Sequence, residues 1–288
     1  AKGALVGLAC GDAVGTTLEF RPPGTFEPIT DMVGGGPFEL KAGQWTDDTS
    51  MALCLAESLV EKEGFDLTDQ LDRYLLWYRR GHLSSTGKCF DIGVTTEGSL
   101  RRYEESGDPF SGQTEPATAG NGSIMRLAPV PLAHAGDLRM AVEKSGESSR
   151  ATHGALEAID SCRYFGGLIA AAVTGTDKDE ILSCFQPDDP SYWKEYPLCE
   201  KVEAIANGSF KMKAPPDIRG TGYVIASLEA ALWAFYTTNS FRDGCLRAVN
   251  LGDDADTTAA VYGQLAGAHY GASAIPSEWI EELTQRPL

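Results

Sequence analysis

The chain has 288 residues, of which 42% are hydrophobic, and its formal net charge at pH 7 is −17. This charge argues against nucleic acid as a partner, because phosphate neutralisation needs clustered Lys and Arg, and it argues equally against an anionic membrane surface. A small anionic ligand is not excluded, since metal ions, backbone N–H groups and helix N-termini act over a few ångströms. The length suffices for a large core, and we expect one domain over residues 1–288.

The cysteine and histidine residues argue against a disulfide framework and against a zinc site. The seven Cys contain no C-x-x-C pair, which fits a reducing, cytoplasmic compartment better than a disulfide framework. The four His show no H-x-x-x-H spacing, so no zinc ligand set is visible. The sequence predicts no signal peptide, and its longest apolar stretch, Tyr164 to Val173, is far shorter than the ~20 residues that span a bilayer.

Helical periodicity dominates the chain from its beginning. An N-terminal apolar run breaks at residues 11–15, and a Pro- and Gly-rich loop follows over residues 21–43. We expect the later helices at residues 51–63, 67–80, 91–105, 138–150, 153–173, 179–185, 202–207, 222–238, 241–249, 258–270 and 277–283. Residues 186–196 read as a Pro-rich surface excursion. Because alternating Val/Ile runs and βαβ spacing are nearly absent, the pattern predicts an all-α, single-domain, compact orthogonal bundle of about a dozen helices.

Two clusters of carboxylates and hydroxyls stand near opposite ends of the chain. Residues 46–49 read Thr-Asp-Asp-Thr, and residues 253–258 read Asp-Asp-Ala-Asp-Thr-Thr. Each precedes an apolar, Ala-rich run. Oxygen ligands gathered in this way suit a hard cation such as Mg²⁺ or Mn²⁺. We therefore expect the fold to bring the two clusters together.

Helix capping is the simpler interpretation of either cluster alone. Thr46 is a favourable N-cap, and acidic residues in a first turn complement the helix dipole. Capping needs only one or two oxygens, however, and adjacent carboxylates repel by about 1 kcal/mol even in water at 4 Å. Six ligands shared over two ions would leave positions for water and substrate, as in a two-metal hydrolytic site. The residues alone leave capping and metal binding both open.

Two other aspartate-based chemistries fit the sequence poorly. Residues 254–258 match the D-x-D-x-T pattern of phosphatases, but that pattern should follow a buried strand, and here it follows a helical segment. Diphosphate–Mg²⁺ prenyl chemistry would need D-D-x-x-D, and Met51 occupies the place of the third Asp. We disfavour both.

Several further motifs accompany the two clusters. They are Gly-Asp-Ala-Val-Gly at 11–15, Glu-Phe at 19–20, Gly-Asn-Gly-Ser-Ile-Met-Arg at 120–126 and Thr-His at 152–153. In this order, and together with the acidic clusters, they resemble the ADP-ribosylglycohydrolase family over roughly residues 3–271. The resemblance implies an all-α enzyme that uses two Mg²⁺ or Mn²⁺ ions to release ADP-ribose from a modified protein.

Carried over motif by motif, the resemblance implies a set of site residues. The metal ligands would be Thr46, Asp47, Asp48, Asp254, Asp256 and Thr257. The catalytic candidates would be Asp48, Glu19 and Asp254, and the substrate-binding residues would be Asp91, Gly120, Asn121, Gly122, Ser123 and His153. The family usually has glycine where this chain has Asp253, which adds a charge beside the site and which we expect to support the ligands indirectly.

Each supporting residue also has a simpler structural interpretation. Glu19 could be an exposed residue entering a loop, residues 120–123 an ordinary turn, and His153 a buried histidine satisfied by backbone. Asp91 could cap a helix over residues 92–105, although a carboxylate would also suit a guanidinium leaving group. The Gly-Asn-Gly turn precedes a helix-like segment, whose free N–H groups would suit a diphosphate.

The leading hypothesis is a cytoplasmic, metal-dependent hydrolase that cleaves the N-glycosidic bond between ADP-ribose and protein arginine, reversing mono-ADP-ribosylation. Its partner would be the ADP-ribosylated protein, and ADP-ribose would be a product. One alternative is hydrolysis of O-linked ADP-ribose, on serine or in an acetyl ester. Another is a non-catalytic member that binds ADP-ribose or is structural, although such a member would be expected to lose some of the six ligands.

Overall fold

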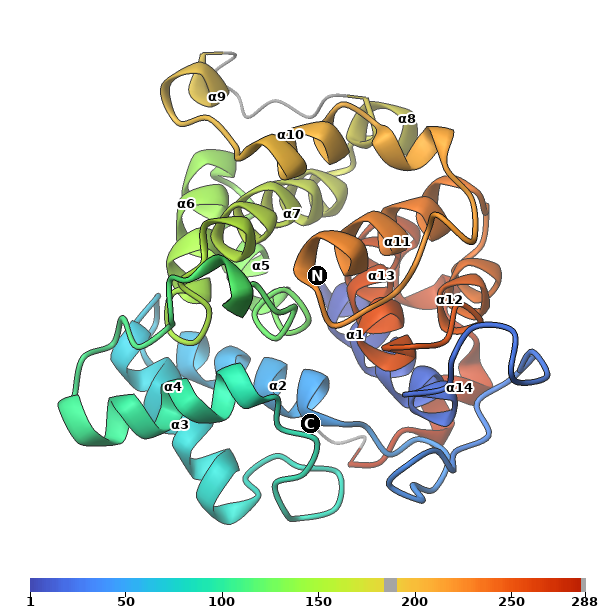
Figure 1. The fold of residues 1–288 in the computed structure, drawn as a ribbon, viewed down its shortest axis with the longest axis horizontal. Coiled ribbons are helices and arrows are strands. Elements are labelled where there is room, and N and C mark those ends of the chain that lie inside the picture. The colour runs from blue at the N-terminus through green and yellow to red at the C-terminus, as the bar shows by residue number, and fades with distance from the viewer. Residues whose placement is uncertain (184–190, 286–288) are drawn as a thin grey trace.

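The computed structural model describes residues 1–183 and 191–285 of the chain. Within these residues it contains fourteen α-helices, four short 3-10 helices and isolated β-bridges instead of strands (Figure 1), so the predicted all-α class is confirmed. The α-helices are α1 Lys2–Gly15, α2 Asp47–Glu61, α3 Leu67–Arg80, α4 Val94–Ser106, α5 Pro129–Ala133, α6 Leu138–Ser149, α7 Leu156–Thr174, α8 Lys178–Ile181, α9 Tyr192–Glu195, α10 Glu200–Ala206, α11 Val224–Tyr236, α12 Phe241–Val249, α13 Ala255–Tyr270 and α14 Ser277–Glu282. The 3-10 helices are Thr16–Leu18, Pro116–Thr118, Ser209–Met212 and Ala272–Ala274.

Helices α1 and α13 form the central pair of the bundle (Figure 1). Four glycines recur every fourth residue along one face of α1, at positions 3, 7, 11 and 15. A Cβ at any of the four would collide with the backbone of α13 or of the residues that follow it. The glycines therefore let the two backbones approach more closely than side chains would allow. This approach fixes the end of α1 against the start of α13.

The predicted break at residues 11–15 is wrong, because α1 runs without interruption to Gly15. Glycine in a helix interior lowers helix stability by ~1 kcal/mol relative to alanine, so closely spaced glycines favour a helix end when only local propensity is considered. Close packing against α13 offsets this cost. The chain leaves the helix only through the 3-10 turn Thr16–Leu18.

Two hydrophobic cores meet near the middle of the molecule. The larger core gathers side chains from α1, α7, α11, α12 and α13, and α13 is buried from Ala255 to Gly267. The smaller core packs α2, α3 and α4 together with Met125. In Figure 1, α1, α11, α12 and α13 lie on the right, α7 lies above the middle, and α2, α3 and α4 lie at the lower left. The junction between the two cores is where the acidic clusters come together.

Several helix boundaries differ from those predicted. Helices α2 and α13 begin earlier than expected, at Asp47 and Ala255, so acidic residues occupy their first turns. Helices α4 and α7 begin three residues later than expected, at Val94 and Leu156. Helix α8 ends at Ile181, and residues 184–185 of the helix predicted there lie outside the described residues, as do residues 186–190 of the predicted excursion at 186–196. The described part of that excursion contains the short helix α9.

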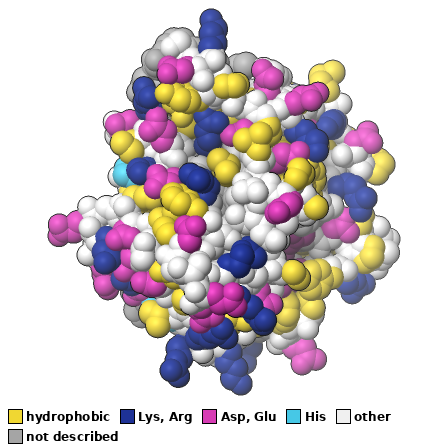
Figure 2. All heavy atoms as spheres, turned by 60° about the vertical axis from the view of Figure 1, so that its left-hand side comes forward, with side chains coloured by type: hydrophobic (Ala, Val, Ile, Leu, Met, Phe, Trp, Pro, Cys, Tyr) yellow, Lys and Arg dark blue, Asp and Glu magenta, His cyan; other side chains and the backbone are white. Residues whose placement is uncertain are grey.

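The loop over residues 21–43 lacks regular structure, as predicted, but it is anchored to the bundle. The Asn250 side chain accepts a hydrogen bond from Ile29 N at 2.8 Å and donates one to Ile29 O at 2.9 Å. On the face drawn in Figure 2, acidic and basic side chains are intermingled over most of the surface. None of the described helices is both long enough and apolar enough to span a bilayer.

Candidate functional site

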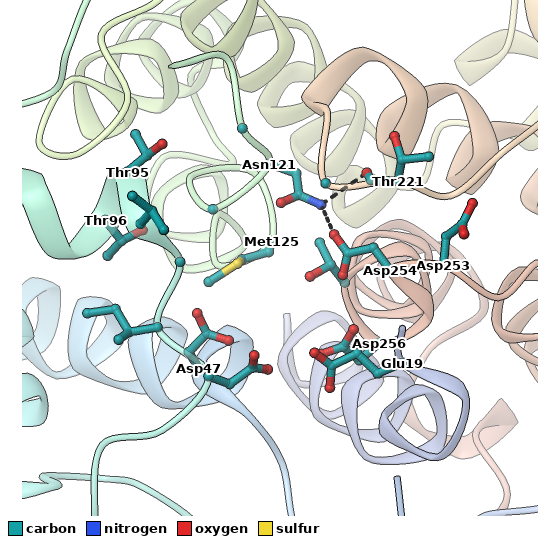
Figure 3. A pocket seen from close by; sticks show the side chains of 18 of the residues that line it. Glu19, Asp47, Thr95, Thr96, Asn121, Met125, Thr221, Asp253, Asp254 and Asp256 are labelled. Atoms are coloured by element: carbon teal, nitrogen blue, oxygen red, sulfur yellow. Dashed lines mark hydrogen bonds between the residues drawn. The ribbon is translucent and has the colours of Figure 1, made fainter. Parts of the chain in front are cut away.

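A cavity of about 540 Å³ opens at the junction of the two cores (Figure 3). One wall comes from the start of α4 and the segment before it, and another from the loop at residues 120–122 and from Thr221 and Gly222. The remaining wall is acidic and contains Glu19, Asp47, Asp91, Asp253, Asp254, Asp256 and Thr257. Segments that lie far apart in the sequence thus build one cavity.

The two acidic clusters meet at this cavity. The Thr257 hydroxyl on α13 lies 3.3 Å from Asp48 Oδ1 on α2, and the Thr46 hydroxyl lies 3.3 Å from Asp256 Oδ2. Thr46 and Asp48 are fully buried beneath the cavity. The sequence prediction that the fold joins the clusters is confirmed.

The acidic side chains carry more negative charge than the protein itself compensates. Asp48 Oδ2, Asp256 Oδ1 and Glu19 Oε2 are buried and have no hydrogen-bond partner. Burial, followed by repulsion from neighbouring carboxylates, raises the pKa of Asp48 and of Asp256 well above the ordinary value. Unpaired buried oxygens that share a space are the donor set a hard divalent cation takes. The residues present therefore fit a metal site.

Helix capping does not account for the acidic residues. Thr46 and Asp254 occupy the N-cap positions of α2 and α13, as predicted for Thr46, but neither side chain makes a capping hydrogen bond. The bonds that satisfy the start of α2 come from Asp12 on α1, which accepts from Thr46 N at 2.9 Å and from Thr49 N at 3.0 Å. The sequence motif around Asp12 did not predict that this residue caps α2.

Glu19 and Asp91 form a close carboxyl pair in the cavity wall, with carboxylate oxygens within 4.8 Å of one another. Burial and the charges of Asp91 and Asp254 raise the pKa of Glu19 to about 10, and burial raises the pKa of Asp91 to about 8. Asp91 does not cap α4, because Gly93 occupies the N-cap position. Instead Asp91 has a positive φ of 59°, a conformation that is uncommon outside glycine. Glu19 is not exposed as its simpler interpretation required, being 3% accessible.

The loop at residues 120–123 is held by backbone and side-chain bonds. Asn121 N donates to Gly222 O at 3.0 Å, and Asn121 Nδ2 donates to Asp254 Oδ2 at 2.7 Å (Figure 3). Ser123 is buried away from the cavity, where its hydroxyl accepts from Ser149 at 2.8 Å.

The expected helix after this loop is absent. The chain forms successive turns there, and the short helix α5 begins only at Pro129. The pattern of Ser, Ile, Met and Arg after residue 122 was therefore misread as helical. No helix N-terminus therefore lies at this loop, and the N–H groups of Gly120 and Asn121 already donate to Thr118 O and Gly222 O.

His153 lies in the turn before α7 rather than within a helix, and it lines the cavity. Burial and the charge of Arg126 lower the pKa of His153 to about 3, so the ring is neutral. The Thr152 hydroxyl accepts from Arg126 at 2.7 Å and lies 2.8 Å from His153 Nδ1. The Thr152 hydroxyl has no other acceptor among the described contacts, so we assign its hydrogen to Nδ1, which places the ring hydrogen on Nε2. Nε2 is thus a neutral donor on the side of Gly120 and Gly122.

Asp253 does not join the other carboxylates. Its side chain forms an ion pair with Arg219 at 2.9 Å and points away from Asp254 and Asp256 in Figure 3. Its backbone pairs with Arg21 and has a positive φ of 53°. Asp253 therefore fixes the turn that precedes Asp254, and its charge is compensated by Arg219.

A family model described as ADP-ribosylglycohydrolase matches residues 1–288. The chain belongs to the ADP-ribosylglycohydrolase family. It is 47% identical to ADP-ribosylarginine hydrolase Tri1 of Serratia proteamaculans (strain 568), covering 99% of this chain and 75% of that protein. It is 31% identical to ADP-ribosyl-[dinitrogen reductase] glycohydrolase of Rhodospirillum rubrum, covering 99% and 90% of the two chains. A solved ADP-ribosylglycohydrolase-related protein complex superimposes with a TM-score of 0.85 at 43% identity, covering 99% of this chain and 92% of that one.

In this ADP-ribosylglycohydrolase, the residues expected from sequence fall into three groups. Those that line the cavity are Glu19, Asp47, Asp91, Gly120, Asn121, Gly122, His153, Asp254, Asp256 and Thr257. Those buried beneath the cavity are Thr46 and Asp48. Ser123 packs elsewhere, against Ser149 and Cys162. Asp12 was missed, although a buried Asp within a glycine-spaced helix face was a usable signal.

Proposed function

We propose that this family member hydrolyses the N-glycosidic bond between ADP-ribose and the guanidino group of a protein arginine. The observation that carries the proposal is the position of Asp256. One Asp256 oxygen lies within 4.8 Å of carboxylate oxygens of Asp12 and Asp48, and one lies within 4.8 Å of those of Glu19 and Asp91. The proposed cation ligands Asp48 and Asp256 therefore lie beside the Glu19–Asp91 carboxyl pair at one cavity.

The proposed ligands are Thr46, Asp47, Asp48, Asp254, Asp256 and Thr257, and the proposed complement is two Mg²⁺ or Mn²⁺ ions. When bound, such ions supply positive charge and Lewis acidity that hold water and ribose oxygens. The unpartnered oxygens of Asp48 and Asp256 support this assignment. The presence of several carboxylates in one buried space supports more than one divalent charge.

Among the catalytic candidates, the geometry favours Glu19 as the group that moves a proton. Glu19 lines the cavity and has an unpartnered Oε2, whereas Asp48 lies beneath the cavity and Asp254 Oδ2 already accepts from Asn121. In its ionised form, which a bound divalent cation nearby would favour, the Glu19 carboxylate can take a proton from the attacking water as the water oxygen bonds to the ribose C1″. The electron pair of the breaking C–N bond passes to the guanidine nitrogen. The guanidine then takes up the proton, so water is consumed and no proton is released.

The other cavity residues suit the two ends of the substrate. Asp91 offers a carboxylate to the guanidinium, which binds carboxylates in a planar, paired geometry. Nε2–H of the neutral His153 and the backbone N–H of Gly122, which is not among the bonds that hold the turn, offer donors to the ribose and phosphate oxygens. These donors act over a few ångströms, so they can bind an anion even though the net charge of the protein is −17. The described cysteines are all free thiols, which supports a reducing compartment such as the cytoplasm.

The test is release of ADP-ribose from two modified proteins, one carrying arginine-linked and one carrying serine-linked ADP-ribose, each with Mg²⁺ and with EDTA. The proposal predicts release from the arginine-linked substrate only, with loss of release in EDTA. Release from the serine-linked substrate alone would reject the arginine assignment. Binding of ADP-ribose without release from either substrate would instead identify a non-catalytic binding protein.

A further inference from the structure

Asp12 stands in the last turn of α1 with a fully buried side chain. Its Oδ1 accepts hydrogen bonds from Thr46 N and from the Thr46 hydroxyl, both at 2.9 Å. Its Oδ2 accepts from Thr49 N at 3.0 Å and from the Thr49 hydroxyl at 2.6 Å. A carboxylate has about four lone-pair sites, so Asp12 has no oxygen site left for a cation. Asp12 is thus distinct from Asp48 and Asp256, which each retain an unpartnered oxygen.

The four bonds reproduce a capping box from a different helix. In an ordinary capping box, the N-cap side chain binds the N–H of the third helical residue, whose own side chain binds the N-cap N–H. Here Thr46 is the N-cap of α2 and Thr49 is the third helical residue, and the Asp12 carboxylate binds both N–H groups. The side chain of Thr46 is therefore not needed for capping.

The direction of the Thr46 hydroxyl follows from the same contact. A hydroxyl has one hydrogen, and we assign it to the shorter of the two carboxylate contacts, 2.9 Å to Asp12 Oδ1 against 3.3 Å to Asp256 Oδ2. The lone pairs of Thr46 Oγ1 are then left on the side of Asp256 Oδ2, 3.3 Å away. Two oxygens that face each other without a hydrogen between them repel unless a cation lies near both.

We propose that Asp12 is a positioning residue for the metal site: it caps α2 from α1 and takes the Thr46 hydroxyl hydrogen, so that the Thr46 oxygen serves as a cation ligand. This inference rests on the proposed metal site. The glycine-spaced face of α1 supports it, because the close approach of α1 to α13 places Asp12 between the two acidic clusters. Metal-supporting hydrogen bonds of this kind typically change metal affinity by ~10–100-fold when removed.

The test measures Mn²⁺ binding to the EDTA-treated protein by electron paramagnetic resonance, for Asp12→Asn, Thr46→Val and the double variant. Asp12→Asn is expected to weaken Mn²⁺ binding by ~10–100-fold. Because Asp12 acts through Thr46, the double variant is expected to bind Mn²⁺ as Thr46→Val alone does. Unchanged binding by Asp12→Asn would overturn the inference, and so would additive losses in the double variant.

Asp160 provides a matched control, since it is a buried aspartate that pairs with Arg163 far from the cavity. Asp160→Asn is expected to lower the thermal midpoint without changing Mn²⁺ affinity, which separates positioning from general loss of stability. If Asp12→Asn does not fold, Thr49→Val removes one of the four bonds and Thr49→Ser keeps it. Weaker Mn²⁺ binding by the valine variant and wild-type binding by the serine variant are expected, and equal binding by the two overturns the role of Asp12. A wild-type protein that binds no Mn²⁺ overturns the metal site itself.

Discussion

The hydroxyl of Thr257 lies 3.3 Å from Oδ1 of Asp48, although 209 positions separate the two residues in the chain. The contact joins the first turn of α13 to the first turn of α2. In a second contact of the same length, the hydroxyl belongs to Thr46 at the start of α2 and the carboxylate belongs to Asp256 on α13. The reciprocal pair makes one site out of two clusters, and the predictions below test how that site is built.

The close approach of α1 and α13 should be required for the site. A Cβ at Gly15 would collide with the backbone of Ala255 and Asp256. We therefore expect Gly15→Ala to lower the free energy of unfolding by ~1–3 kcal/mol, as overpacking does, and to weaken Mn²⁺ binding. Urea unfolding and Mn²⁺ titration check both effects. Gly64→Ala is the control, because open space surrounds Gly64, and equal stability of the two variants would contradict the packing argument.

The stability of the metal-free protein should fall as pH rises from about 5 to above 8. The pKa values of Glu19 and Asp91 are raised in the folded protein to about 10 and about 8, so the folded protein keeps protons that the unfolded chain has lost. The stabilisation is present below the unfolded pKa values and is lost as pH rises through the folded ones.

Thermal unfolding of the EDTA-treated protein at a series of pH values checks this prediction. Glu19→Gln should flatten the decline, because it removes one of the titrating groups. Added Mn²⁺ should raise the thermal midpoint more at pH 8 than at pH 6, since binding then displaces fewer protons. A midpoint that rises with pH in EDTA would show that the carboxylates are not buried together.

Filling the space at Gly122 should hinder substrate binding. A Cβ there would lie 2.8 Å from His153 Cε1 and 3.1 Å from Thr96 Oγ1, so the imidazole would have to move. We expect Gly122→Ala to weaken ADP-ribose binding by at least ~10-fold, equivalent to about 1.4 kcal/mol. Isothermal titration with ADP-ribose measures it. Gly136→Ala, at a position with open surroundings, should bind as the wild type does. Wild-type affinity for ADP-ribose in Gly122→Ala would show that the loop at residues 120–122 does not belong to the substrate site.

Asp253 should be replaceable, unlike its neighbours. Asp253→Gly removes the ion pair with Arg219, and surface ion pairs contribute ~0–1 kcal/mol to stability. It also relieves the positive φ at this position, which costs a non-glycine residue ~1 kcal/mol. The two effects should nearly cancel, leaving stability and turnover close to wild type. A large loss of Mn²⁺ affinity in this variant would show that Asp253 contributes to the ligand set directly.

The sequence predicted the fold class and most helices because apolar periodicity reports which face of each helix is buried. It failed at residues 11–15, where glycine spacing encodes contact with α13, a partner 240 residues away in the chain. Local propensity carries no information about such a partner. Helix α4 begins late because Asp91 has a positive φ of 59°, which is not helical, and Gly93 occupies the N-cap position.

The site was predictable to the extent that its chemistry is concentrated in short motifs. The excess of oxygen atoms at residues 46–49 and 253–258 indicated that the clusters belong together, and Thr257 and Asp48 do meet. The role of Asp253 was not predictable, because the ion pair with Arg219 depends on the fold. Asp12 was missed for a related reason, as its partners Thr46 and Thr49 lie on another helix.

The central claim is that Asp48 and Asp256 belong to a site for two divalent cations. Calorimetric titration of the EDTA-treated protein with Mn²⁺, for wild type and for Asp256→Ala, tests it most directly, with circular dichroism to confirm that the variant is folded. The account predicts two Mn²⁺ ions per wild-type chain and loss of tight binding in folded Asp256→Ala. Absence of Mn²⁺ binding by the wild type, or wild-type binding by Asp256→Ala, would contradict it.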